Sequence, residues 1–243
     1  MTKRGYDVWG NQSFELEGKI REIDMDAVMP IPAFKSFGKW ELNPNVAIES
    51  KMSRKYVWIF HRSDTSVGHC AISHGLDAIA VRHRNFGHLC SIFDLHYASR
   101  DVASTFAIVD PKTSDVCKKD EIFDAANKLR EFVNYRSRLL LPHFDARRRD
   151  IIFYFPIIVF DGMLYEGDSR TGTLRITPID SIVLETRTVS SITGKLEPMY
   201  IDVVTKNGFV KHLSMIEREA AKTAKNLSTK RTQNLLTKML AHQ

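Results

Sequence analysis

The longest apolar run in the chain, Ile151–Phe160, is the feature that most limits how the chain can fold. Its branched and aromatic side chains favour a strand, and a run this apolar is best accommodated in a buried position. The run is much shorter than the ~20 residues that span a bilayer. We therefore predict a buried strand, then a tight turn at Asp161 and Gly162, and a returning strand at Met163–Glu166.

The rest of the chain predicts an α/β protein. Apolar side chains recur at helical spacing over Asp120–Leu141 and again after Gly208, which predicts a helix at each place. A helix over Ala71–Val81 is an ambiguous reading. Strands are predicted at residues 13–17, 20–28, 46–51, 57–60, 91–97, 104–109, 174–188 and 199–205. We expect a core in residues 1–115 that residues 116–243 continue, with a second sheet layer from residue 151 onward.

The positive charge of the chain is concentrated near its C-terminus. After residue 205 there are eight Lys or Arg and two Asp or Glu, which accounts for the whole net charge of +6. A basic segment can bind the phosphates of nucleic acid, so Lys222 and Lys225 are candidate binding residues. Arg147, Arg148 and Arg149 form a second candidate group. A solvated helix face and a solvated loop are the alternative readings.

Cysteine usage and the apolar pattern indicate where the protein works. Cys70, Cys90 and Cys117 are too few and too scattered for a disulfide framework, so we expect reduced thiols and a cytoplasmic protein. No signal peptide is predicted, and no apolar run is long enough to cross a membrane. The chain also lacks the glycine-rich nucleotide motifs and the nucleophile elbow, which leaves those enzyme classes without support.

Two neighbouring predicted strands carry the groups that phosphodiester hydrolysis needs. Asp24 lies on the strand 20–28, with Asp26 on the same face, and Glu49 and Lys51 share one face of the strand 46–51. Carboxylate oxygens suit Mg²⁺, and a bound divalent ion lowers the pKa of water. We predict a Mg²⁺ or Mn²⁺ site at Asp24, Glu49 and Asp26, with Lys51 near the attacking water. The alternative is a set of solvent-facing strand residues in which Lys51 pairs with a carboxylate.

This arrangement resembles the PD-(D/E)xK, or restriction-endonuclease-like, superfamily of nucleases. A short hairpin ends in Arg-Glu-Ile-Asp at residues 21–24, a loop follows, and the motif apolar-Glu-x-Lys comes at residues 48–51. The likeness is concentrated in residues 11–60. It implies a mixed β-sheet flanked by helices, in which Asp24 and Glu49 bind Mg²⁺ and Lys51 orients or activates the attacking water. The later strands and the basic terminal helix would be additions to that sheet.

The resemblance also implies a function and raises one structural question. It implies a metal-dependent nuclease that cuts DNA, with defence against foreign DNA as one expected role, as a homodimer or with a partner subunit. The first helix of that family often supplies a further Glu, and residues 3–8 are similar only to its end, so we expect the helix itself to be missing. The alternative function is an inactive nuclease-like module that binds nucleic acid or a partner protein within a larger complex.

Several other residues stand out without a settled role. Trp58 and Phe60 could stack on a base, although core packing is the simpler reading. Lys128 and Arg130 lie on a predicted helix as DNA-facing residues or as ordinary surface charges. Asp202 is an unassigned charge in an apolar strand. Six potential zinc ligands crowd together without a standard metal-binding spacing, namely His69, Cys70, His74, His83, His88 and Cys90.

Overall fold

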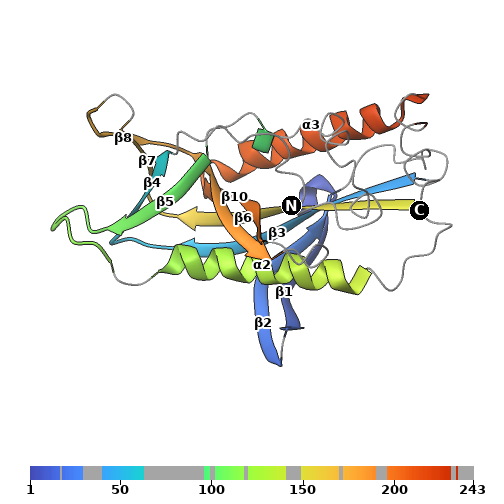
Figure 1. The fold of residues 1–243 in the computed structure, drawn as a ribbon, viewed down its shortest axis with the longest axis horizontal. Coiled ribbons are helices and arrows are strands. Elements are labelled where there is room, and N and C mark those ends of the chain that lie inside the picture. The colour runs from blue at the N-terminus through green and yellow to red at the C-terminus, as the bar shows by residue number, and fades with distance from the viewer. Residues whose placement is uncertain are drawn as a thin grey trace.

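The computed structural model describes residues 1–16, 18–29, 40–62, 96–98, 102–117, 120–140, 149–169, 172–189, 196–230 and 234. Within these residues, ten strands form one mixed sheet in the order β1-β2-β3-β6-β10-β9-β5-β4-β7-β8. Two long helices lie on opposite sides of the strands (Figure 1). The elements are η1 (Thr2–Arg4), β1 (Asp7–Leu16), β2 (Lys19–Val28), β3 (Trp40–Met52), β4 (Val57–Arg62), η4 (His96–Ala98), β5 (Val102–Val109), α2 (Glu121–Leu140), β6 (Arg149–Asp161), β7 (Leu164–Asp168), β8 (Arg175–Pro178), β9 (Ser181–Val189), β10 (Leu196–Thr205) and α3 (Phe209–Leu227).

The first three strands form an antiparallel unit, as the sequence predicts. Strands β1 and β2 are joined by a tight turn in which Gly18 has a φ of 74°, a left-handed conformation that suits glycine. Strand β3 pairs with β2 in an antiparallel register that runs from Met25 opposite Ile48 to Val28 opposite Asn45. The two strands that carry the predicted carboxylates are therefore neighbours.

Strand β6 is the predicted buried strand, and it lies between β3 and β10, parallel to both. Phe155, Ile157, Ile158 and Phe160 are completely buried. Because both edges of β6 are occupied, the strand that follows it cannot return along it. The predicted hairpin is therefore wrong, and β7 pairs instead with β4 and β8.

The remaining strands continue the same sheet rather than forming the second layer that we expected. Strand β9 pairs with β10, and β5, β4, β7 and β8 follow in order. Three strands separate β4 from β6 in the sheet, yet the ring of Trp58 on β4 stacks on that of Phe160 on β6, with centroids 3.8 Å apart. This contact shows that the sheet curls strongly. Trp58 and Phe60 are both fully buried, which confirms the core-packing interpretation.

The register across the three central strands assigns their residues to the two faces of the sheet. Ile157 on β6 is aligned with Ile48 on β3 and with Asp202 on β10, so these three side chains point to one face. Glu49 is one residue beyond Ile48 and points to the other face. Two acidic residues on the strands that flank β6 are thus directed to opposite sides of the sheet.

Each of these faces is covered by one of the two predicted helices. Helix α2 lies on the Glu49 face, and α3 covers the Asp202 face (Figure 1). The side chains of α2 that follow the predicted spacing are buried, except for Phe123, which is half exposed. Leu213, Ile216 and Ala220 on α3 are buried as predicted. Within the described residues, no helix is long and apolar enough to cross a membrane.

The helix predicted over residues 71–81 lies outside the described residues, as do residues 91–95 of another predicted strand. The last residues of that predicted strand differ from the expectation, because His96–Ala98 form a 3-10 turn, η4. The chain begins with another short 3-10 turn, η1, before it enters β1.

Candidate active site

Asp24 and Glu49 meet where the ladder between β2 and β3 ends. The register that sets Met25 opposite Ile48 would next set Asp24 opposite Glu49. At this point the carboxylate of Asp24 takes the place of a strand carbonyl, because its Oδ2 accepts a hydrogen bond of 2.5 Å from the backbone N–H of Ser50. The sequence prediction that these two carboxylates lie on neighbouring strands is confirmed.

Glu49 is the most enclosed group of this site. Its side chain is fully buried, and its Oε2 lies 3.3 Å from Nζ of Lys51 and 3.3 Å from Nζ of Lys128 on α2. Both lysines approach the same oxygen. The other oxygen, Oε1, is buried and has no hydrogen-bond partner among the described residues. Buried polar atoms are normally paired, so an unpaired carboxylate oxygen marks a place where a ligand could bind.

The electrostatic surroundings of Glu49 also favour a bound ligand, in this case a cation. Burial raises the pKa of Glu49, and the negative charge of Asp24 raises it further, against the opposing effect of Lys128 and Lys51. The two lysines therefore do not fully compensate the cost of holding this carboxylate charged beside a second one. A cation shared by Asp24 and Glu49 would remove that repulsion.

Asp26, the third predicted metal ligand, has a different partner. It is buried, and its Oδ2 lies 3.4 Å from the guanidinium of Arg136 on α2. Burial raises the pKa of Asp26, whereas the charge of Arg136 lowers it. Its Oδ1 has no hydrogen-bond partner among the described residues. A role for Asp26 as a metal ligand stays a prediction.

The predicted nucleic-acid contacts whose side chains the structure describes, Lys222 and Lys225, lie away from this site. Lys222 and Lys225 are exposed on α3, which covers the opposite face of the sheet. Arg147 and Arg148 lie outside the described residues, and Arg149 is the first residue of β6. Lys128, to which the sequence assigns no definite role, contacts Glu49 directly. The six potential zinc ligands between residues 69 and 90 also lie outside the described residues.

A second buried polar cluster lies on the α3 face, and sequence reasoning missed most of it. Nε2 of His96 lies 2.8 Å from Oδ1 of Asp202, and Nε2 of His212 lies 3.1 Å from Oδ2. The hydroxyl of Tyr97 donates a hydrogen bond to Oδ2 of Asp202, and Oε2 of Glu219 lies 2.7 Å from Nδ1 of His96. The cluster of His96, Asp202 and His212 could hold a metal ion, because all three potential ligand atoms lie within 4.8 Å of one another.

The charges in this second cluster stabilise each other. Burial alone would lower the pKa of His96, but the carboxylates of Asp202 and Glu219 raise it to about 9. Burial alone would raise the pKa of Asp202, but the two histidines hold it well below its usual range. The only sequence signal for this cluster is the charged Asp202 in an apolar strand, since His96 is 106 residues away.

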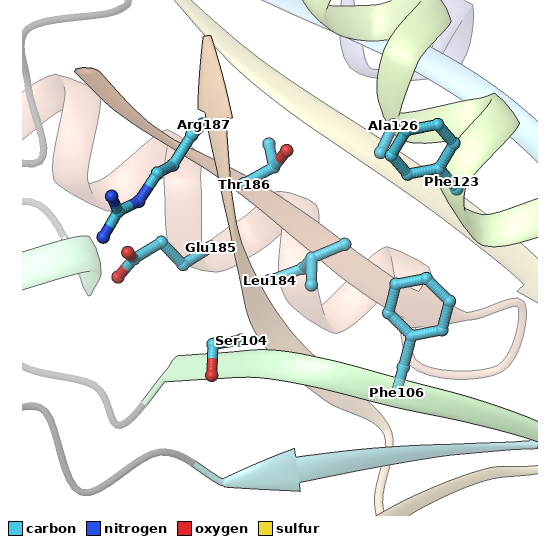
Figure 2. Close-up of a pocket in the computed structure, with 8 residues that line it drawn as sticks. All are labelled: Ser104, Phe106, Phe123, Ala126, Leu184, Glu185, Thr186 and Arg187. Carbon is cyan, nitrogen blue, oxygen red and sulfur yellow. The ribbon is translucent and has the colours of Figure 1, made fainter. Parts of the chain in front are cut away.

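An open pocket of about 340 Å³ lies between α2, β5 and β9. Phe123 and Phe106 line one side of it, and the polar side chains of Glu185, Arg187 and Ser104 line the other (Figure 2). Phe123 is the α2 residue that departs from the buried face. The pocket contains none of the residues predicted to be catalytic.

Comparison of the chain with protein-family models, with curated proteins and with solved structures found no match. The function must therefore be inferred from the residues and the geometry described above.

Proposed function

We propose that the protein is a metal-dependent nuclease that hydrolyses phosphodiester bonds in DNA. The observation that carries this proposal is the opposition of Asp24 and Glu49 at the end of the β2–β3 ladder, with a buried, unpaired oxygen on Glu49. Two lysines surround the same carboxylate. This combination of paired carboxylates and adjacent cations suits binding and cleavage of a phosphodiester.

The residues fit a magnesium or manganese ion. Mg²⁺ is commonly bound by one or two carboxylates, with water and phosphate oxygens completing its coordination. Oε1 of Glu49 has no other partner among the described residues, and Asp24 contributes a second carboxylate from the neighbouring strand. When bound, the ion would lower the pKa of a water molecule and neutralise charge on the phosphate.

The two lysines would have separate roles. Lys51 is on the same strand and the same face as Glu49, so it can orient a water molecule above the two carboxylates. Lys128 comes from α2 and fixes Oε2 of Glu49, which leaves Oε1 available. Each ammonium group also adds positive charge near the position of the phosphate. A mixed sheet with helices on both sides agrees with the resemblance to PD-(D/E)xK nucleases.

The decisive experiment measures cleavage of plasmid and single-stranded DNA with Mg²⁺ or Mn²⁺. Lys51→Met keeps the length of the side chain but removes its charge, and we expect it to reduce cleavage at least 100-fold, the scale of losing a positioned proton-transfer group. Asp24→Asn should do the same. Lys55→Met is a matched control, because Lys55 lies just beyond β3 and pairs with Asp110 away from the site.

The outcomes separate nuclease activity from binding alone. Metal-dependent cleavage that is lost in Lys51→Met and kept in Lys55→Met supports the proposal. Equal cleavage by Lys51→Met and the wild-type protein would refute the assignment of this site. The complete burial of Glu49 between two lysines favours the second candidate, a module that binds DNA without cutting it. That candidate predicts salt-sensitive DNA binding without cleavage and without a metal requirement.

A further inference from the structure

The cluster beneath α3 combines ligand atoms of the kind that transition metals prefer. His96 comes from η4, Asp202 from β10 and His212 from α3, and all three are buried. Two imidazole nitrogens and one carboxylate oxygen form a donor set that suits zinc and similar ions better than Mg²⁺. The element η4 is far in the sequence from β10 and α3, which follow one another, so an ion at this point would join η4 to both of them.

Glu219 provides the outer contact that a metal-binding histidine usually has. Its Oε2 lies 2.7 Å from Nδ1 of His96, so this nitrogen carries a proton and donates it to the carboxylate. The other ring nitrogen, Nε2, donates a hydrogen bond of 2.8 Å to Oδ1 of Asp202, and a bound ion would take the place of that proton. A carboxylate that holds the far side of an imidazole fixes its tautomer and increases the basicity of the ligating nitrogen.

His212 supplies the second, independent observation. Its Nε2 is buried and lies 3.1 Å from Oδ2 of Asp202, but the contact lacks the geometry of a hydrogen bond. The same oxygen already accepts a hydrogen bond of 2.9 Å from the hydroxyl of Tyr97. A buried ring nitrogen directed at a carboxylate without a hydrogen bond is costly unless another group binds it.

The charges of the cluster can be balanced by a divalent ion or by protons. With neutral imidazoles, Asp202 and Glu219 leave two negative charges beneath α3, and one divalent cation cancels both. The metal-free alternative is to protonate His96 and His212, which would make the cluster a pair of buried ion pairs. Ionised groups are expensive to bury in either case, so the cluster must be compensated in one of these two ways.

We propose that His96, Asp202 and His212 bind one divalent transition ion, with zinc as the preferred metal, and that this ion fastens η4 and α3 to β10. The described residues supply three ligands, which together with one water molecule complete a four-coordinate site. The site is separate from the one proposed for catalysis, because Asp202 and Glu49 point to opposite faces of the sheet.

The test uses the full chain, freed of metal by a chelator and then titrated with Co²⁺, whose visible absorption reports coordination by nitrogen and oxygen ligands. We expect one equivalent to bind with a tetrahedral spectrum and to be displaced by Zn²⁺. His212→Gln should abolish this spectrum, and Glu219→Gln should weaken binding about 10–100-fold. His61→Gln is the matched control, because His61 is an exposed strand residue beside Ser169.

Every outcome of the Co²⁺ titration either supports or overturns the proposed metal site. Failure of the wild-type protein to bind Co²⁺ stoichiometrically would overturn it in favour of the metal-free ion pairs, as would an unchanged spectrum in His212→Gln. If circular dichroism shows that His212→Gln does not fold, Glu219→Gln decides, and unchanged affinity in that variant overturns the proposal. Asp24→Asn should leave the spectrum intact, so loss of cleavage and loss of this site are distinguishable.

Discussion

Glu49 and Asp202 are both buried carboxylates at the centre of one sheet, yet their surroundings have opposite effects. Asp202 accepts contacts from His96, Tyr97 and His212 on both of its oxygens, and its pKa is held low. Glu49 has two lysines on one oxygen and, among the described residues, no partner on the other, and its pKa is raised. Burial alone therefore does not tell whether an acidic residue stabilises the fold.

The different surroundings of Asp202 and Glu49 indicate a structural role for the first residue and a functional role for the second. The partners of Asp202 are themselves buried, so removing the carboxylate would leave His212 and Tyr97 without it and His96 with Glu219 alone. Lys51 and Lys128 retain 23% and 35% of their side-chain exposure, so they can turn towards water if Glu49 is neutralised. A carboxylate whose pKa is raised by burial and whose partners are partly exposed is the pattern expected of a binding site, whereas a carboxylate among buried partners is expected of a structural core.

The largest loss in the free energy of unfolding should come from Asp202→Asn, measured by urea unfolding in buffer without divalent ions. The substitution keeps the size of the side chain but removes the negative charge that the two buried histidines share, which leaves only Glu219 beside His96. Breaking a buried ion pair costs about 3–5 kcal/mol, so we expect a loss of that order. A loss below about 1 kcal/mol would show that His96 is compensated by Glu219 alone and would remove the contrast with Glu49.

A smaller loss is expected for Tyr97→Phe, which removes one donor from Asp202 and keeps the ring. A hydrogen bond to a charged group contributes about 1.5–3 kcal/mol, and the free energy of unfolding should fall by that amount. Because the ring of Tyr97 packs near those of His96 and Phe155, phenylalanine should preserve the packing. An unchanged stability would mean that the hydroxyl contact is not part of the cluster.

The smallest change in the free energy of unfolding is expected for Glu49→Gln, the matched substitution on the α2 face of the sheet. It removes a charge that burial and Asp24 both disfavour, so the free energy of unfolding should change by less than about 1 kcal/mol. Urea unfolding of this variant beside Asp202→Asn compares the two carboxylates under the same conditions. A loss of about 3 kcal/mol or more would instead make Glu49 the anchor of a structural ion-pair cluster.

Local patterns in the sequence predicted the elements around Glu49 well. The period of two places Glu49 and Lys51 on one face, and the spacing of apolar residues in Asp120–Leu141 predicts α2. The strands of Asp24 and Glu49 were predicted to be neighbours from the resemblance, because the turn at Gly18 joins only β1 and β2. The predictions of the shared face and of α2 depend on residues that are close in sequence, where the backbone periodicity carries the information.

The path of the chain after β6 and the cluster around Asp202 depended on contacts that no local pattern encodes. The Asp161–Gly162 turn predicted a hairpin, but local turn chemistry does not reveal that β3 and β10 occupy both edges of β6. His96 and His212 belong to no motif, and they meet Asp202 only through the sheet and α3. The charge of Asp202 in an apolar strand did signal that partners must exist, because an unpaired buried charge would not be tolerated.

The order of the strands also determines when each side of the sheet can form during folding. Contacts between distant segments must first overcome the entropy of closing a long loop, which slows their formation. Lys128 and Glu49 are 79 residues apart, whereas His96 is 106 residues from Asp202 and 123 from Glu219. Because β10 and α3 are the last elements in the chain, we expect the α2 side to be able to assemble before the α3 side during synthesis. In a chain growing on the ribosome, η4 would wait for β10 and α3 to emerge before the last part of the core could close.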